Sequence, residues 1–276
     1  MVVDTHVHVV AEDQRRYPRQ LSGAHTEWVR DTSGEKVLSL MGEAGIDRTM
    51  LVQAYGAYKY DNSYAADCAV AHPDRFASVC IVDPLQNDAP DKLSYWVKER
   101  HVRGMRLFNL TEPEGNWLDD PRTFPLWERA ASLAIPLCVC TRFHDLPRLR
   151  PALERFPGVP LALDHLGLPR LDDGPPYDAL KPLFEMARLP NVYLKFSTVS
   201  MYAVRRGKST ARELFQRLLE RFGARRMMWG SNYPATYDRS LKAQLELARG
   251  ELSFLPEEDR RWLFGETALT LWPMPR

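Results

Sequence analysis

Two histidines near the start of the chain, His6 and His8, stand two residues apart in the segment DTHVH. Residues two apart lie on the same face of a β-strand, so a strand here would place two imidazoles side by side. Such a pair can bind a metal ion or an anionic oxygen. The spacing alone is equally that of two ordinary polar residues at the end of a strand, so it needs support from the rest of the chain.

Further polar residues with useful chemistry lie in or directly after short apolar segments. They are Arg106 in GMRLF, His165 in LALDH, Lys195 and Ser197 in NVYLKFS, and Asn232 in MMWGSN. Any one of them is as easily an ordinary surface residue, because long charged side chains often keep their heads in water. Asn232 differs from the others, since its amide cannot act as an acid or a base. Taken together, these positions favour an enzyme site.

Eight apolar, β-branched segments read as strands: 2–8, 49–53, 76–83, 104–108, 136–141, 160–165, 191–197 and 227–232. Amphipathic helical patterns lie between them, for example at 36–45, 92–101, 124–134, 146–156 and 211–223. Strand and helix in alternation predict a parallel sheet with helical crossovers. Eight such units favour an α/β fold of the (β/α)8 TIM-barrel type, and the glycine-rich dinucleotide fingerprint is absent after the first strand.

The barrel gives the scattered polar residues a common location. In such barrels the active site lies at the C-terminal ends of the strands, which is where these residues stand. No flexible linker or low-complexity tract divides the sequence, so residues 1–276 are predicted to form a single barrel domain.

Composition excludes several classes of partner. The 37 Lys and Arg residues nearly balance the 36 Asp and Glu residues, which gives no argument for binding nucleic acid or an anionic membrane. No apolar stretch approaches the ~18–20 residues of a membrane span, and the N-terminus lacks a signal-peptide pattern. The four cysteines show no CxxC spacing and are expected to be buried free thiols. We expect a cytoplasmic protein with a small-molecule substrate.

Several segments together resemble the amidohydrolase superfamily, in its amidohydrolase-related branch. They are DTHVH, AHPDRF, RGMRLF, DHLGLP, MMWGSNYP and the terminal FGETALTLW, and they span nearly the whole chain in family order. This branch includes 2-pyrone-4,6-dicarboxylate lactonase, sulfomuconolactone hydrolase and the L-fuconolactonase group. The resemblance implies an amidohydrolase-type barrel and a hydrolase that opens a cyclic ester of a small carboxylated or sugar-derived substrate.

The resemblance also implies roles for single residues. His6 and His8 would bind one divalent metal, zinc or manganese, or would hold the substrate in a metal-free site. His165 would polarise the substrate carbonyl, and Arg106 would bind a substrate carboxylate through its bidentate fork. Asn232 takes the position at which the family usually keeps a water-activating aspartate.

The asparagine changes what is expected of the site. A divalent cation prefers at least one anionic ligand, so two imidazoles and an amide favour a metal-free site. Another group must then act as the base, with His8 and His165 ahead of Asp4 and Asp164. A lactone tolerates the loss of the carboxylate because its leaving group is far better than an amine. Lys195, the histidines and the Asn232 amide would then stabilise the oxyanion.

Other residues complete the predicted pocket. Tyr55 lies in a tyrosine-rich segment after the second strand, His144 follows the fifth strand, and Ser197 ends the seventh. All three are candidate substrate contacts, and the substrate is expected to be anionic. The long excursion at 12–28 is a candidate lid or oligomer face. Such scaffolds often form dimers, so a homodimer is a candidate assembly.

Two other functions compete with the lactonase prediction. Loss of the aspartate could accompany a change to lyase, decarboxylase or isomerase chemistry on a conjugated carboxylic acid. It could also mark a binding protein without catalysis, although the presence of His6, His8, His165, Arg106 and Lys195 argues against that.

Overall fold

The computed structural model describes residues 1–21, 26–110, 117–171, 174–236 and 238–274. Eight parallel strands form one sheet in the order β1 to β8. They are β1 (Val3–Val7), β2 (Arg48–Val52), β3 (Phe76–Ile81), β4 (Gly104–Asn109), β5 (Leu137–Thr141), β6 (Leu161–Leu163), β7 (Val192–Ser197) and β8 (Met227–Gly230). Every predicted strand is present, and the (β/α)8 barrel prediction is confirmed.

The barrel closes between its first and last strands just beyond β8. The Asn232 backbone N–H donates to the His6 carbonyl at 2.8 Å, and the His8 N–H donates to the Tyr233 carbonyl at 2.8 Å. Gly230 allows this close approach, since a Cβ there would lie 2.7 Å from the His6 Cβ. The closure therefore fixes the turn after β8 against the two histidines of β1.

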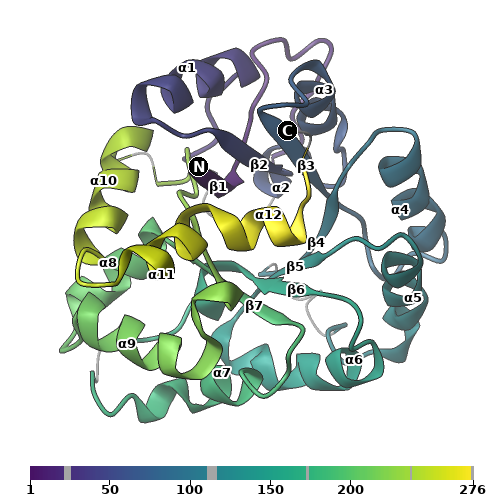
Figure 1. Ribbon diagram of the computed structural model, residues 1–276. Helices are drawn as coiled ribbons and strands as arrows, with labels where there is room; N and C mark the ends of the chain where they lie inside the picture. Colours follow the sequence, from purple (N-terminus) through teal and green to yellow (C-terminus); the bar gives the residue numbers. More distant parts are fainter. Residues whose placement is uncertain (22–25, 111–116, 172–173, 237, 275–276) are drawn as a thin grey trace.

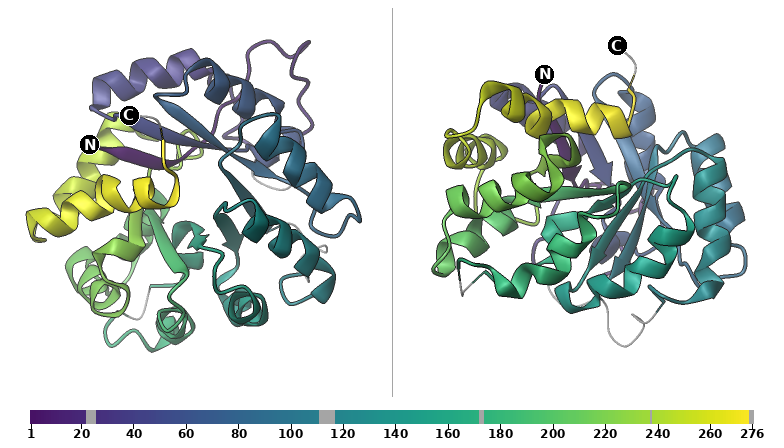
Figure 2. Two further views of the ribbon diagram at one scale, coloured as in Figure 1. Left: turned by 45° about the vertical axis from the view of Figure 1, so that its right-hand side comes forward. Right: turned by 60° about the horizontal axis from the view of Figure 1, so that its bottom comes forward.

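Most of the helices surround the strands on the outside, and α12 crosses one end of the barrel (Figures 1 and 2). They are α1 (Gly34–Ala44), α2 (Tyr55–Tyr58), α3 (Ser63–Ala71), α4 (Ala89–Lys98), α5 (Phe124–Ser132), α6 (Arg150–Arg155), α7 (Lys181–Met186), α8 (Thr198–Arg206), α9 (Ala211–Phe222), α10 (Leu241–Glu251), α11 (Glu257–Arg261) and α12 (Thr267–Leu271). The helix predicted at 146–156 is a 3-10 turn over Phe143–Leu149 followed by α6, because Pro147 cannot donate a helical hydrogen bond. Of the described helices, none has the length and apolarity needed to cross a lipid bilayer.

The barrel interior is filled by small and medium apolar side chains and closed at one end by α12. Ala268, Leu271 and Trp272 pack against interior residues of six strands: Val3, Met50, Val52, Ala77, Val79, Cys138, Ala162 and Met228. Figure 1 shows α12, in yellow, crossing the end of the barrel at which the chain begins. The N-terminal end of the barrel is therefore plugged, which leaves the C-terminal end for a site.

Trp272→Ala should remove the centre of this plug. Burying a tryptophan this completely predicts a loss of about 3–5 kcal/mol in the free energy of unfolding. Trp96→Ala is the matched control, because Trp96 of α4 is only partly buried. Urea denaturation of both variants measures the difference, and equal losses would contradict a plug that stabilises the barrel.

Candidate functional site

Three histidines meet at the C-terminal end of the barrel. His6 lies on β1, His8 directly follows β1, and His165 follows β6. The His6 ring centroid lies 5.0 Å from that of His8 and 4.7 Å from that of His165. All three rings are buried. The structure thus brings together the histidines that the strand-end pattern selected.

A fully buried carboxylate, Asp164, lies beneath them. It accepts from Arg106 Nε at 2.7 Å and lies 3.2 Å from Lys195 Nζ and 3.5 Å from His6 Nδ1. Burial alone would raise the pKa of Asp164, but the charges of Lys195 and Arg106 outweigh it and hold that pKa well below its usual value. One carboxylate from the turn after β6 therefore joins cations from β4 and β7 and the first histidine of β1.

Lys195 and Arg106, which were both predicted to act on the substrate, are bound to Asp164 in this arrangement. Lys195 is almost fully buried, with Nζ 3.2 Å from Cys138 Sγ and 5.1 Å from the centroid of the Trp272 ring. Burial lowers the pKa of Lys195, but Asp164 more than compensates and the ammonium stays charged. Lys195 lies inside the barrel, between the plug and the histidines. Arg106 binds Asp164 and stacks over Phe108, with 5.0 Å from Cζ to the ring centroid.

His8 is held in one tautomer by the backbone. Its Nδ1 lies 2.8 Å from the Val52 carbonyl oxygen, which can only accept, so Nδ1 carries the proton and Nε2 a lone pair. Burial, reinforced by the charge of Arg106, lowers the pKa of His8 to about 3. At neutral pH the ring is therefore uncharged and Nε2 is free to accept a proton.

The other two imidazoles are also neutral. Burial lowers the pKa of His165 to about 4, and its Nδ1 lies 2.8 Å from Ser197 Oγ. Burial likewise holds the pKa of His6 well below its usual value, against the attraction of Asp164. Within the described part of the chain, neither ring nitrogen of His6 has a hydrogen-bond partner.

Asn232 is placed beside the histidines by the strand closure. Its backbone φ is 63°, in the left-handed region that asparagine tolerates better than most residues. Asp4 secures the neighbouring backbone by accepting from the N–H groups of His6 at 3.0 Å and Ser231 at 2.8 Å. Asn232 is 9% exposed, and among the described residues only its backbone takes part in hydrogen bonds. Its amide is thus available to a ligand.

The two remaining carboxylates weighed as bases have little access to a water molecule. Asp4 and Asp164 are both 0% exposed; Asp4 accepts from two backbone N–H groups through Oδ1, and Asp164 is bound by Arg106 and Lys195. Burial raises the pKa of Asp4 to about 6, but the same burial keeps the carboxylate from solvent water. His8 therefore remains the better placed base.

Aromatic side chains form one wall beside the cluster. Tyr55 stacks on Phe108 with a centroid distance of 4.9 Å and an interplanar angle of 27°. Trp28 lies against His8, with centroids 5.2 Å apart. The excursion after β1 therefore reaches the site through Trp28. The sequence did not predict Trp28 or Phe108 as site residues, because the prediction selected polar side chains at the ends of strands and these two are aromatic.

His144 is the predicted site residue that the structure leaves apart from the others. Its side chain is 73% exposed, and its Nε2 lies 3.5 Å from a carboxylate oxygen of the adjacent Asp145. No described contact joins it to the histidine cluster. Its role as a substrate contact stays a prediction.

The donors at this end of the barrel do not fit a tightly bound catalytic zinc ion. Such an ion usually takes three protein ligands. Among the described residues, no three His, Cys, Asp or Glu side chains are arranged to hold a metal. The nearest carboxylate, Asp164, is already bound by Arg106 and Lys195. His6, His8 and Asn232 would offer only neutral donors. That the site works without metal stays a prediction, which metal analysis of the purified protein would test.

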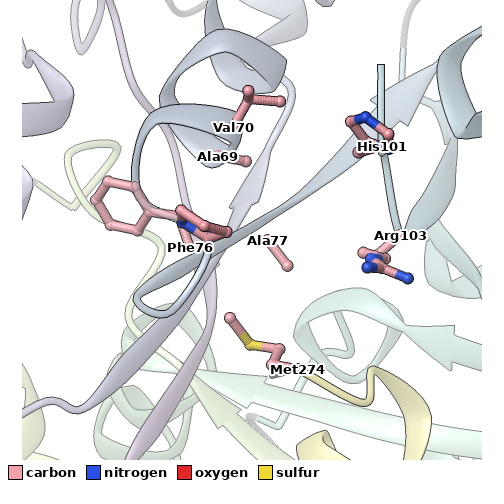
Figure 3. A pocket seen from close by; sticks show the side chains of 8 residues that line it. Ala69, Val70, Phe76, Ala77, His101, Arg103 and Met274 are labelled. Carbon is pink, nitrogen blue, oxygen red and sulfur yellow. The ribbon is translucent and has the colours of Figure 1, made fainter. Parts of the chain in front are cut away.

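A separate cavity of about 170 Å³ lies at the opposite end of the barrel (Figure 3). It is lined by residues from α3, the starts of β3 and β4, and the C-terminal segment: Ala69, Val70, Pro73, Phe76, Ala77, His101, Arg103 and Met274. It is smaller than the ~300–1,000 Å³ of typical ligand pockets and holds no paired catalytic groups. The strand-end cluster is therefore the candidate active site.

Residues 3–274 match the family model described as amidohydrolase. The chain belongs to the amidohydrolase family. This agrees with the barrel, with the paired β1 histidines and with the cluster of polar residues at the strand ends.

Two curated relatives of this amidohydrolase act on lactones, by their names. An L-fucono-1,5-lactonase from Burkholderia ambifaria is 27% identical over 240 residues, covering 85% of this chain and 80% of the relative. A 4-sulfomuconolactone hydrolase from Hydrogenophaga intermedia is 24% identical over 266 residues, covering 94% and 84%. A crystal structure of an amidohydrolase from Burkholderia multivorans with bound zinc shares the fold, with a TM-score of 0.79, 24% identity and full coverage of both chains.

Asp164→Asn should leave Arg106 and Lys195 as buried, uncompensated cations. Removing one partner of such a group typically costs about 3–5 kcal/mol of unfolding free energy. Adding Lys195→Met to Asp164→Asn should restore part of the loss, because it removes one of the stranded charges. Asp119→Asn is the control, since its pair with Arg148 is solvent-exposed and should be worth less than ~1 kcal/mol. Equal losses in Asp164→Asn and Asp119→Asn would contradict the account of Asp164.

Proposed function

We propose that this amidohydrolase opens a lactone by adding water to its ester carbonyl. The observation that carries the proposal is the fixed tautomer of His8, which leaves a lone pair on Nε2 of a neutral ring at the end of the barrel where the Asn232 backbone bonds to His6. Both curated relatives have lactone-hydrolase names, which supports a cyclic ester over an amide.

The chemistry follows from these groups. His8 Nε2 takes a proton from water while the water oxygen bonds to the ester carbon. The carbonyl oxygen becomes an oxyanion, and the Asn232 amide and His165 donate to it. The ring C–O bond then breaks, the oxyanion collapses to a carboxylic acid, and the imidazolium returns its proton to the departing alkoxide. Water is consumed and the product is a hydroxy acid.

The low pKa of His8 makes it a weak base in the free protein but not in the reacting complex. The negative oxyanion that forms beside the ring favours the imidazolium and raises the pKa of His8 at that step. The alkoxide of a lactone is also a better leaving group than an amine, so less help with proton delivery is needed. The absent aspartate is therefore tolerable for a lactone.

The substrate we propose is small, flat or sugar-derived, and anionic. A guanidinium has five N–H donors, so the bond from Arg106 to Asp164 leaves others for a substrate carboxylate. Tyr55 and Phe108 offer a stacked aromatic wall for a flat ring. Lys195 does not contact the substrate in this proposal; its positive charge balances the negative charge of Asp164. A homodimer and a cytoplasmic location stay predictions from the sequence.

A second candidate function is decarboxylation or another non-hydrolytic reaction of a conjugated carboxylic acid. The specific observation in its favour is Asn232, because a site that activates no water needs no carboxylate at that position. Arg106 and the aromatic wall would suit such a substrate equally well.

A panel of sugar-derived and carboxylated lactones, followed by proton release, separates the two functions. We expect turnover of at least one lactone, and a fall of roughly 10²–10⁴-fold in kcat for His8→Gln, which removes the base. His101→Asn is the control, since that histidine lines the cavity at the opposite end of the barrel and Asn suits its positive φ. If no lactone is opened while a conjugated acid releases carbon dioxide, the hydrolase proposal is wrong.

A further inference from the structure

Ser197 was predicted to contact the substrate, but its hydroxyl is engaged by the protein. It lies at the end of β7, where the strand register pairs it with Gly230, two residues before Asn232. Its Oγ lies 2.8 Å from His165 Nδ1, and the same oxygen caps α8 by accepting from the backbone N–H of Ser200. Ser197 is therefore buried between a helix cap and a site histidine.

The hydrogen-bond capacity of a hydroxyl limits what this contact can be. A serine has one O–H donor and two lone pairs, and the Ser200 N–H takes one of the lone pairs. Within the described part of the chain, His165 Nδ1 is the one acceptor within hydrogen-bond distance of the hydroxyl. If Nδ1 carried the proton instead, the buried O–H would have no acceptor, which typically costs about 1–3 kcal/mol.

We propose that Ser197 is a positioning residue: it donates to His165 Nδ1 and thereby fixes the proton of that ring on Nε2. The inference deepens the proposed function, on which it rests for its catalytic meaning. His8 donates to a carbonyl and keeps a lone pair on Nε2, whereas His165 accepts from a hydroxyl and keeps a proton on Nε2.

The two neutral histidines therefore have opposite roles. His8 can take a proton from water, and His165 can donate a hydrogen bond to the developing oxyanion without any charge of its own. Each role is set by a neighbour that cannot easily move, since Val52 belongs to β2 and Ser197 is held by the capping box of α8. Histidine thus supplies both the base and the hydrogen-bond donor, because the proton is fixed on Nδ1 in His8 and on Nε2 in His165.

Nitrogen-15 NMR of the histidine-labelled, ligand-free protein tests this directly. Long-range proton–nitrogen correlations distinguish a protonated ring nitrogen from a bare one, and His8→Gln and His165→Gln assign the signals. We expect the proton on Nδ1 in His8 and on Nε2 in His165. A wild-type His165 ring with its proton on Nδ1 would overturn the inference, and this spectrum needs no variant at Ser197.

Variants then test the part played by Ser197. Ser197→Ala should release His165 from the single tautomer and lower lactone-opening kcat by roughly 10²-fold, as expected for one lost oxyanion donor. Ser197→Thr keeps the hydroxyl and the cap and should restore both the tautomer and kcat. Ser200→Ala is the control, because it removes only the other half of the capping box. An unchanged His165 tautomer in Ser197→Ala would show that Ser197 does not set it.

The NMR result is separable from the proposed function. If the tautomers are as expected but no lactone is opened, the tautomer assignment of the two histidines stands and the lactonase proposal fails. If lactones are opened while His165 carries its proton on Nδ1, the hydrolase proposal stands and the role given to Ser197 fails.

Discussion

The contact of Asp164 with Arg106, Lys195 and His6 is the constraint on which the rest of the site depends. Strands β4 and β7 and the turn after β6 each contribute one charged group to the buried interior, and none of these charges would be tolerated there alone. The carboxylate balances the cations and faces the first histidine. Below it, Lys195 reaches the Trp272 plug, so the charge centre links the closed end of the barrel to the open one. Positioning of the histidines and stability of the barrel thus rest on the same interaction.

Among the described residues, Asp4 and Asp164 are held in structural contacts, and the groups proposed to act on the ester, His8, His165 and Asn232, are uncharged. Burial and the Arg106 charge keep His8 neutral, burial keeps His165 neutral, and Asn232 carries no charge at any pH. A site of this kind is suited to a reaction in which charge appears only in the transition state, because dipoles already aimed at the oxyanion need no reorganisation. Opening a lactone is such a reaction. In the proposed mechanism the asparagine is a working part of the site, since it would supply an N–H donor where a carboxylate would repel the oxyanion.

Much of this could be predicted from the sequence, because it depends on local pattern. The apolar segments predicted the eight strands, and the polar residues at the ends of these segments predicted His6, His8, His165 and Asn232 as site residues. The pairing of side chains across the barrel could not be predicted, because it joins residues from different strands. Asp164 was weighed as an unlikely base, yet it is the charge centre. Lys195 and Ser197 were expected to face the substrate, yet they contact Asp164 and His165. Trp28 reaches His8 from an excursion that carries no periodic signal at all.

The central claim is that the Asn232 amide takes part in catalysis and that a neutral histidine has replaced the carboxylate base. The pH profile of kcat/KM for lactone opening in Asn232→Asp, compared with the wild type, tests it most directly. The substitution preserves shape and suits the left-handed backbone at this position. The account predicts a fall of roughly 10²–10³-fold at neutral pH, because a donor to the oxyanion becomes a negative charge. A gain in activity above the carboxylate pKa would contradict it, and would show a hydrolase that lacks its base.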